Sequence, residues 1–426
     1  MLKRRSFYVL IGLGSFFLLF LMLDERFGSP LVYQIQPTAA VPHTKQKKIA
    51  PKEKLAKIQK PVEVLLLPDT AGVKKKLKPT SSEKILEQII STQRKLISKD
   101  MKGYEYPDGK YNISASKLED LVMEKHGRPV RSLIVTTWRS GSTFFGDILN
   151  AHPANYYHYE PLLAFDIVQV RGPPLSSKAL KWVKDLLNCE YEDLGEYIDY
   201  GKPHPWVFNH NTNLWKQCER HKGVCYDYKF LSSMCKLFPF QSMKLVRLRL
   251  RIAQELLADE KLAVRMVLLV RDPRGILQSR KHRDWCPSSP DCFDPALTCA
   301  DLVSDYKVAV ELLKKYPTRF KVIRYEDLSL DPYKHVEELY KFYGLNLHPR
   351  MKKFLDSHTK ASKGGVSSTF RNSAIAPFHW RTELEFAEVE EIQEYCTTAM
   401  KYWGYVPAMN ATHQKEFNPV TNYALK

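Results

Sequence analysis

The fold is decided by one stretch, Leu133-Ile134-Val135-Thr136-Thr137-Trp138-Arg139-Ser140-Gly141-Ser142-Thr143-Phe144. It opens with an apolar run typical of a buried strand, and apolar residues at 144, 145, 148 and 149 then follow with helical spacing. The stretch therefore predicts a strand, a tight turn and a helix start. Unpaired N–H groups and the positive end of the helix dipole make such a turn an anion site. Gly141 permits close approach, and Arg139 adds a fixed positive charge.

A second apolar run, Met266-Val267-Leu268-Leu269-Val270, leads directly into Arg271-Asp272-Pro273-Arg274. It is too short for a typical helix and is followed by proline and glycine, so it predicts a second buried parallel strand. Arg271, with Ser279 and Arg280 further on, can meet a second phosphate. Either motif alone is typical of an ordinary capped turn. Both together, each after a strand, predict the two halves of a nucleotide-phosphosulfate site.

The wider pattern alternates between strands and helices. Strands are predicted at 132–136, 244–250, 265–270 and 320–324, and helices near 142–150, 251–258, 300–315 and 333–343. This order indicates an α/β fold with a P-loop-like, mostly parallel sheet and helices on both faces. Ligands of such sheets bind at the carboxyl ends of the strands, where both motifs lie. The lysine of a nucleoside-triphosphate P-loop is absent, which argues against that class of ligand.

The chain resembles the Golgi carbohydrate 6-O-sulfotransferases, which sulfate galactose, N-acetylglucosamine or N-acetylgalactosamine. The similarity runs from about residue 131 to about residue 406. It is carried by Trp138-Arg139-Ser140-Gly141-Ser142, His152-Pro153, Tyr159-Glu160-Pro161-Leu162, Val246-Arg247-Leu248, Leu269-Val270-Arg271-Asp272-Pro273-Arg274, Arg324-Tyr325-Glu326-Asp327-Leu328 and the segment 369–384. Thr143 and Phe145 depart from the usual family residues, which leaves the acceptor sugar open.

The resemblance implies the sulfotransferase fold and 3′-phosphoadenosine 5′-phosphosulfate as co-substrate, with no metal. The first motif would hold the 5′-phosphosulfate and the second the 3′-phosphate, and Arg371 would reach toward the 3′-phosphate. The expected donor-binding residues are Arg139, Ser140, Gly141, Ser142, Thr143, Phe144, Arg271, Ser279 and Arg371.

Sulfuryl transfer resembles phosphoryl transfer, so catalysis is expected to consist mainly of positioning and electrostatic stabilisation, with Arg139 in the second role. A sugar hydroxyl also needs a base, and Glu160 is the first candidate. The aromatic residues 156–159 before it would raise its pKa by desolvation and stack on a sugar. In the alternative, Glu160 pairs with an arginine and the aromatic residues pack. His152 and His158 are weaker candidates.

Two further groups of charged residues are of interest. Arg247, Arg249 and Arg251 alternate with apolar residues, so a strand would place them on one face. That face would bind an anionic acceptor, or it would be solvated or paired with carboxylates. Glu326 or Asp327 is expected to pair with an arginine of the site.

The N-terminus indicates a membrane anchor. Lys3-Arg4-Arg5 precede eighteen uncharged residues, 6–23, which is the minimum length of a membrane span. Positive charge before the span favours a cytosolic N-terminus; a cleaved signal peptide is the alternative. The predicted organisation is a cytosolic tail (1–5), an anchor (6–23), a luminal stem (24–125) and a catalytic domain (126–426), in the Golgi membrane with single-pass type II topology.

Cysteines and sequons agree with a luminal location. The eight cysteines all follow the anchor and stem, at positions 189, 218, 225, 235, 286, 292, 299 and 396. An even number in an oxidising compartment predicts disulfides. The pairing stays open, although the clusters at 218–235 and 286–299 indicate local loops. Asn112 and Asn410 begin N-glycosylation sequons.

The expected reaction is sulfuryl transfer to the 6-hydroxyl of a sugar in a glycosaminoglycan or glycoprotein glycan. The alternatives are a protein-tyrosine sulfotransferase and a catalytically silent glycan-binding scaffold. The expected partners are a glycan or proteoglycan acceptor and the Golgi membrane; no nucleic acid is expected, and a homodimer stays open. The net charge of +18 overstates the basicity of the catalytic domain, because about nine of these charges lie in residues 28–100.

Overall fold

The computed structural model describes residues 81–360, 369 and 372–426. These residues belong to one compact unit that spans Lys76–Lys426. The predicted cytosolic tail, the predicted anchor and residues 24–80 of the predicted stem lie outside the described residues. Within the described part of the chain, no helix is both long and apolar enough to cross a membrane.

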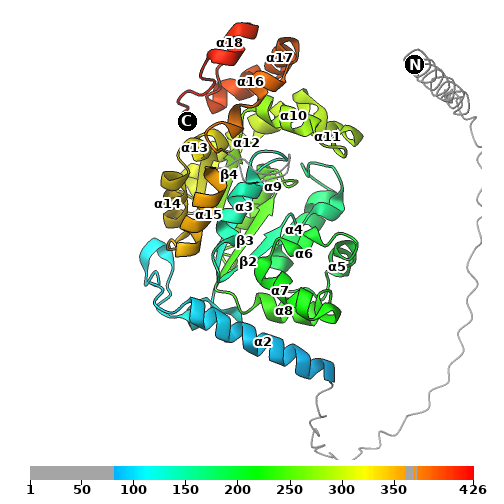
Figure 1. Ribbon diagram of the computed structural model, residues 1–426, viewed down its shortest axis with the longest axis vertical. Coiled ribbons are helices and arrows are strands. Elements are labelled where there is room, and N and C mark those ends of the chain that lie inside the picture. The colour runs from blue at the N-terminus through cyan, green and yellow to red at the C-terminus, as the bar shows by residue number, and fades with distance from the viewer. Residues whose placement is uncertain (1–80, 361–368, 370–371) are drawn as a thin grey trace, which may run out of the picture. The chain divides into compact units, whose positions relative to one another are not determined.

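A five-stranded parallel sheet forms the centre of the unit, in the order β2-β3-β1-β4-β5 (Figure 1). All residues of β1, β3 and β4 are buried. Burial on both faces is typical of a parallel sheet whose crossover helices cover it. The strands are β1 (Val130–Val135), β2 (Asn155–Tyr159), β3 (Phe240–Leu245), β4 (Arg265–Val270) and β5 (Phe320–Arg324). The predicted parallel sheet is confirmed.

Helices cover both faces of the sheet. The β1–β2 crossover through α3 runs in the opposite direction across the sheet from the β3–β4 crossover through α9. Because such crossovers are right-handed, the two helices lie on opposite faces. α14 packs on β1, and α12 packs on β5 and α9. The bounds are α3 Ser142–Asn150, α9 Leu250–Ala258, α12 Pro295–Lys315 and α14 Pro332–Tyr343.

The remaining helices build the walls around the sheet. Between β2 and β3 lie α4 (Leu175–Leu187), α5 (Gly195–Gly201), α6 (Trp206–Asn209), α7 (Thr212–Arg220) and α8 (Tyr228–Cys235). After β4 come α10 (Pro273–Lys281) and α11 (Pro290–Phe293). After β5 come α13 (Tyr325–Leu330), α15 (Pro349–Thr359), α16 (Trp380–Glu383), α17 (Phe386–Trp403) and α18 (Ala411–Glu416). Short 3₁₀ turns occupy Lys110–Asn112, Leu118–Leu121, Met123–Lys125, Leu163–Phe165, Lys222–Val224, Cys286–Ser288 and Ala376–Phe378.

One predicted strand differs from the structure, and one observed strand was not predicted. The strand predicted at 244–250 is β3, which ends at Leu245, and the chain beyond it makes only an isolated bridge from Leu248 to Val170. The prediction overran because apolar residues continue to alternate up to Leu250, although the arginines between them are buried as well. The edge strand β2 was missed because its run of tyrosines, which favours a strand, was assigned to a ligand-stacking surface instead.

The segment 81–125, predicted as stem, is folded onto the domain. It begins with α2 (Ser81–Asp100), which packs against α8 and buries Ile89, Ile90 and Ile97. Arg94 forms a two-pronged ion pair with Glu124, with distances of 3.0 and 2.6 Å. The stem boundary at 125 therefore lies too late, because a helix with a buried apolar stripe is part of the core.

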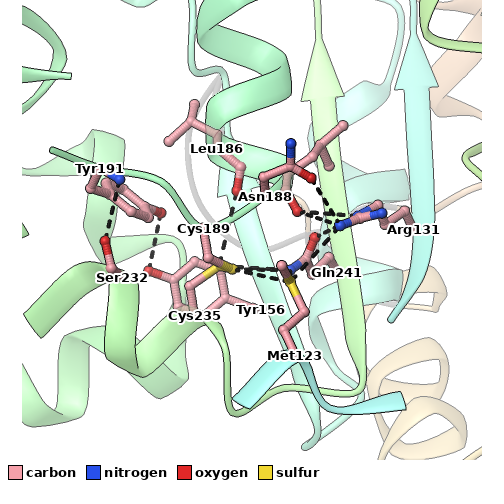
Figure 2. The surroundings of a disulfide bond; sticks show 11 residues. Met123, Arg131, Tyr156, Leu186, Asn188, Cys189, Tyr191, Ser232, Cys235 and Gln241 are labelled. Atoms are coloured by element: carbon pink, nitrogen blue, oxygen red, sulfur yellow. Dashed lines mark hydrogen bonds between the residues drawn. A yellow bond between two sulfur atoms is a disulfide. The ribbon is translucent and has the colours of Figure 1, made fainter. Parts of the chain in front are cut away.

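All eight cysteines form disulfides, as predicted. Cys218–Cys225 and Cys286–Cys292 are the local loops expected from their spacing, whereas Cys189–Cys235 and Cys299–Cys396 join distant segments. Figure 2 shows that Cys189–Cys235 lies beside β3, where Gln241 Nε2 donates to Cys189 Sγ at 3.2 Å. These long-range bonds join helical segments: Cys189, just after α4, to Cys235 of α8, and Cys299 of α12 to Cys396 of α17.

Candidate functional site

A cavity of about 520 Å³ opens at the carboxyl ends of the strands. This is the usual position for ligands of an open parallel sheet. The predicted site residues on its wall are Arg139, Gly141, Ser142, Thr143, Phe144, Glu160, Arg271 and Ser279. Several other residues also line it without a predicted site role, among them Trp138, Tyr200, His204, Trp206, Trp285 and Tyr325. The structure thus brings the two predicted motifs and the candidate base together.

The turn after β1 can form only with glycine at its centre. Gly141 has φ +84° and caps α3, and a Cβ there would lie 2.2 Å from the Tyr325 ring. Arg139 also has a positive φ, of 65°, and its Nε donates to Ser279 Oγ at 3.0 Å. Arg271 Nη1 donates to Arg139 O at 2.7 Å. The two motifs are therefore joined by direct hydrogen bonds.

The turn has unused hydrogen-bonding capacity. Ser140 Oγ and Arg271 Nε are buried, and neither has a hydrogen-bond partner among the described residues. The Arg271 guanidinium lies 4.9 Å from the centre of the Tyr325 ring, which holds it in place. A buried polar atom without a partner is costly unless a ligand or water satisfies it. Orphaned donors beside a helix N-terminus are what an anionic phosphosulfate requires, so these residues fit the implied co-substrate.

Glu160 is paired with two cations in the structure. Lys244 Nζ lies 2.8 Å from its Oε1, and Arg247 Nη1 lies 3.1 Å from its Oε2. Burial would raise the pKa of Glu160, but Lys244 and Arg247 outweigh it and lower the pKa to about 2. The expected rise in pKa is therefore wrong: the carboxylate stays ionised because the aromatic surroundings also contain two buried cations.

Lys244, for which no site role was predicted, contacts both the turn after β1 and Glu160. It is fully buried in β3, and its Nζ lies 3.3 Å from Thr143 Oγ1 and 3.8 Å from the centre of the Tyr159 ring. Burial would lower the Lys244 pKa, but Glu160 and Tyr159 raise it above its ordinary value. This lysine therefore stays charged between the donor loop and the candidate base. The sequence signal that could have identified Lys244 as a site residue was its position at the carboxyl end of a predicted parallel strand.

The aromatic residues before Glu160 have a packing role. Tyr156, Tyr157 and His158 are buried in β2, and of the four residues 156–159 only Tyr159 lines the cavity. Tyr159 stacks on His210, with ring centres 3.7 Å apart. The predicted sugar-stacking role of the run is thus wrong for its first three residues, because they belong to a strand covered on both sides.

The two weaker base candidates are also buried. Burial lowers the pKa of both His152 and His158 to about 3. Neither lines the cavity. Neutral imidazoles enclosed by protein, away from the cavity wall, are core residues.

The arginines of the second motif separate into two roles. Arg271 faces the cavity, whereas Arg280 is buried and donates to Thr137 Oγ1 at 2.7 Å and to Cys292 O at 2.8 Å. Arg280 therefore does not meet a phosphate, contrary to expectation, because protein oxygens already occupy its donors. Arg274 pairs with Asp272 at 2.7 Å.

The acidic pair after β5 does not reach an arginine of the site. Asp327 forms an ion pair with Arg324, 2.8 Å away in the same segment. Glu326 instead accepts the Asp272 N–H at 3.0 Å and the Tyr405 hydroxyl at 2.9 Å. Both side chains therefore brace the loops behind the cavity.

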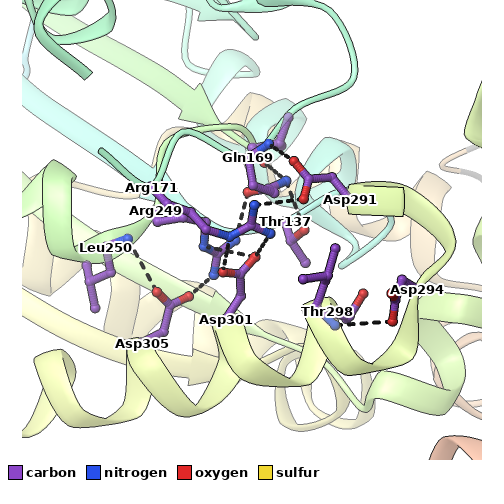
Figure 3. A network of polar contacts seen from close by, with 12 residues as sticks. Thr137, Gln169, Arg171, Arg249, Leu250, Asp291, Asp294, Thr298, Asp301 and Asp305 are labelled. Atoms are coloured by element: carbon purple, nitrogen blue, oxygen red, sulfur yellow. Dashed lines mark hydrogen bonds and ion pairs between the residues drawn. The ribbon is translucent and has the colours of Figure 1, made fainter. Parts of the chain in front are cut away.

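The three arginines that were expected to share one face, Arg247, Arg249 and Arg251, have three different surroundings. Arg247 reaches Glu160, and Arg251 is exposed on α9. Arg249 enters the buried network of Figure 3, where it pairs with Asp305, and Arg171 bonds Asp301 and Asp291 at 2.8 and 2.7 Å. The sequence alternative of carboxylate pairing thus holds for Arg247 and Arg249.

Three further expectations concern ligands and modification. Arg371 lies outside the described residues. In the described residues, no group of three or more His, Cys, Asp or Glu side chains is placed to hold a metal ion. Asn112 and Asn410 are both exposed, and Asn410 Oδ1 caps α18 by accepting the His413 N–H at 2.9 Å.

The parallel sheet, the anion-binding turn after β1 and the linked arginine loop after β4 define a transferase of nucleotide-borne anionic groups. The chain belongs to the sulfotransferase family, since the family described as Sulfotransferase domain matches residues 129–404. Members of this class use 3′-phosphoadenosine 5′-phosphosulfate as co-substrate, as predicted.

Curated relatives agree with this assignment. Carbohydrate sulfotransferase 5 of Mus musculus is 27% identical over 339 residues, which cover 68% of this chain and 85% of that protein. Carbohydrate sulfotransferase 6 of Homo sapiens is 26% identical over 330 residues, covering 67% and 83%. The predicted resemblance to carbohydrate sulfotransferases is confirmed. Among solved structures, the sulfotransferase domain of the Synechococcus PCC 7002 olefin synthase covers 63% of this chain and 94% of that chain, with 17% identity and a TM-score of 0.37.

Proposed function

We propose that the protein transfers a sulfuryl group from 3′-phosphoadenosine 5′-phosphosulfate to the 6-hydroxyl of a sugar. The acceptor would be N-acetylglucosamine, galactose or N-acetylgalactosamine in a glycosaminoglycan or glycoprotein glycan. One observation carries the proposal: Arg139, its partner Ser279 and the ionised carboxylate of Glu160 face the same cavity. The names of the curated relatives support a sugar acceptor.

The donor half of the cavity is built for negative charge. Arg139 and the backbone N–H groups of Gly141, Ser142 and Thr143 would hold the phosphosulfate at the start of α3. Arg271 and Ser279 would hold the 3′-phosphate, with Arg371 as a third predicted contact. Charge develops on the bridging oxygen as the sulfur–oxygen bond breaks, and fixed donors stabilise it without reorganisation.

The acceptor half supplies the base. Glu160 would take the proton of the sugar hydroxyl while that oxygen forms its bond to sulfur. The products are the sulfated sugar and adenosine 3′,5′-bisphosphate, so one S–O bond forms as one breaks. Lys244 and Arg247 keep Glu160 ionised and fix its orientation, and Lys244 also touches Thr143 of the donor turn. This contact would align base and donor, the main requirement of such a transfer.

The uncharged segment at 6–23 supports a proposed type II anchor in the Golgi membrane. Four disulfides and two exposed sequons in the folded unit favour a luminal catalytic domain. Immunofluorescence of the full chain, with protease protection of a C-terminal tag in sealed vesicles, tests both points. A tag cleaved without detergent would contradict the topology.

The reaction is tested by transfer of radiolabelled sulfate from the donor. Chondroitin, keratan-type and N-acetylglucosamine-terminated glycans are compared with a tyrosine peptide. Label is expected on a glycan, and an acceptor whose 6-hydroxyl is replaced by hydrogen should take none. Label on the tyrosine peptide alone would show the acceptor class to be wrong.

Matched variants assign the label to the site. Arg139→Ala should lower transfer by about 10²- to 10³-fold, as loss of a transition-state donor does. Glu160→Gln should lower it by about 10²- to 10⁴-fold, as loss of a general base does. Arg220→Ala removes an exposed arginine at the end of α7, away from the cavity, and should change nothing. Equal effects of all three would indicate that overall charge, not the site, governs transfer.

A further inference from the structure

Two tryptophans remain exposed, and both lie on the cavity wall. All seven tryptophans of the chain are among the described residues, and five of them are buried or half-buried. Trp206 is 43% exposed and Trp285 is 37% exposed, and both line the cavity. A large exposed aromatic side chain on a concave surface is typical of a binding site rather than of a core.

Trp206 is held in place by stacked neighbours. It begins α6, and its ring meets that of His204 edge-on, with centres 4.9 Å apart. His204 stacks on Tyr200 at 4.2 Å, and its Nδ1 lies 2.8 Å from Tyr200 O. The indole therefore stays exposed although its orientation is fixed, so little side-chain entropy is lost when a ligand covers it.

Trp285 is held by a different set of contacts. The Cys286–Cys292 disulfide closes the short loop that follows it. Ser288 Oγ donates to Trp285 O at 2.6 Å, and the Trp285 ring packs edge-on to Trp138, with centres 6.1 Å apart. Since Trp138 belongs to the donor-binding turn, Trp285 lies close to the reacting end of the cavity.

The two indoles belong to different sides of the site. Trp206 comes from α6, which packs against the edge strand β2. Trp285 contacts Trp138, which follows β1, and β3 lies between β2 and β1. The two strands are thus two spacings apart, about 10 Å. Glu160 follows β2 and pairs with Lys244 of β3, so the candidate base lies at the same strand ends.

We propose that Trp206 and Trp285 are sugar-binding platforms that hold the acceptor as a linear oligosaccharide, with one ring stacked on each indole and the reacting sugar near Glu160. The inference rests on the proposed function and specifies the form of its acceptor. A pyranose ring presents C–H groups with partial positive charge, and an indole face is negative, so the two surfaces attract each other. Two such platforms select for a chain of several sugars over a single sugar.

The test compares a monosaccharide glycoside with a hexasaccharide that contains the same reacting sugar. Trp206→Ala and Trp285→Ala should each raise the KM of the hexasaccharide about five- to tenfold, the value of one aromatic stack. The KM of the monosaccharide and that of the donor should change less than twofold. Trp206→Phe and Trp285→Phe should recover most of the loss. Tyr395→Ala removes an aromatic side chain that is 56% exposed on α17, outside the cavity, and is the matched control.

A second readout does not depend on turnover. Calorimetry measures binding of a hexasaccharide that lacks the reacting 6-hydroxyl to protein saturated with adenosine 3′,5′-bisphosphate. The double alanine variant should bind it at least 20-fold more weakly while its Tm and its affinity for the bisphosphate stay at wild-type values. Unchanged hexasaccharide binding by a folded double variant would overturn the inference. A wild-type protein that sulfates only the tyrosine peptide, or no glycan, would instead refute the proposed function itself.

Discussion

Lys244 Nζ lies 2.8 Å from Glu160 Oε1, and the lysine side chain is fully buried. The pair joins two neighbouring strands at their carboxyl ends, because Lys244 belongs to β3 and Glu160 follows β2. A buried cation of this kind fixes both the charge and the direction of the carboxylate. It also explains why the protein retains two cations beside its candidate base: a single buried carboxylate without a partner would take up a proton.

Loss of this pair should alter the pH profile of transfer. In the wild type the pKa of Glu160 is about 2, so the base is ionised throughout the range from pH 4 to 8. Lys244→Met removes a cation that lowers this pKa, while burial still raises it. The variant should lose roughly 10²-fold in kcat/KM at neutral pH. Its rate should fall further as pH drops toward 4, whereas Lys401→Met, at an exposed position of α17, should keep the wild-type profile. An identical profile in Lys244→Met would show that Glu160 is not the base.

Glycine should be required at position 141 because it has no Cβ, and not only because its backbone tolerates a positive φ. Gly141→Ala places a Cβ 2.2 Å from the Tyr325 ring, which supports Arg271. Gly103→Ala is the matched control, because Gly103 also has a positive φ, of 79°, but has no atom within 4 Å of a new Cβ. Both changes strain the backbone by about 1 to 2 kcal/mol.

Only Gly141→Ala should also weaken binding of adenosine 3′,5′-bisphosphate, by at least tenfold in calorimetry, and reduce transfer more than 100-fold. Equal behaviour of the two variants would mean that Tyr325 moves aside freely.

Glu326 should make the protein less stable as the pH rises toward neutrality. Burial, followed by the charge of Asp272, raises its pKa from 4.5 to about 7. Between these values the folded state holds a proton that the unfolded state has released, so the free energy of unfolding falls as pH rises. Glu326→Gln should remove this slope between about pH 4.5 and 7. The measurement is Tm as a function of pH for the wild type, for Glu326→Gln and for Glu219→Gln, which changes an exposed residue and serves as the control. Parallel curves for wild type and Glu326→Gln would contradict the prediction.

α2 should contribute to the stability of the domain and not to its chemistry. Ile97 is 2% exposed and its neighbour Leu96 is 43% exposed, so the two side chains form a matched pair on one helix. Ile97→Ala should lower the free energy of unfolding by about 2 to 4 kcal/mol, and Leu96→Ala by less than about 1 kcal/mol. Urea unfolding measures both. Equal losses would mean that α2 is not packed on the domain, and kcat should be unchanged in either variant at a temperature where both are folded.

Local sequence patterns were sufficient for β1, β4, β5 and the donor turn, but they misplaced β3. The apolar runs before Arg139 and Arg271 predict buried strands by themselves, because a short aliphatic run followed by a glycine turn can be recognised without knowing any distant partner. The Asn-Tyr-Tyr-His-Tyr run of β2 contains no aliphatic residue, and it is covered both by α3, which precedes it, and by α6 and α7, which come later in the chain. The same limit applied to Lys244, whose partner Glu160 lies far away in sequence.

Buried charge was the second source of error. The alternation around Arg249 predicted one shared arginine face without deciding between an acceptor site, a solvated surface and carboxylate pairing; Arg249 is buried, and Asp305 and Asp301 of α12 neutralise it (Figure 3). Likewise the local disulfides were anticipated from their spacing, while the partners of Cys189 and Cys299 could be identified only once the helices were in place. Long-range electrostatic and covalent partners are properties of the assembled domain.

The position of α2 also governs how the chain is made. Its buried stripe, which includes Ile89, Ile90 and Ile97, rests on α8, and α8 is synthesised about 130 residues after α2. At a synthesis rate of about 5 to 20 residues per second, α8 is therefore made roughly 6 to 26 s after α2. During that interval the stripe is open to chaperones and to other nascent chains. A change on this face of α2 would consequently reduce the amount of enzyme that leaves the ribosome correctly folded, while each molecule that did fold would turn over normally.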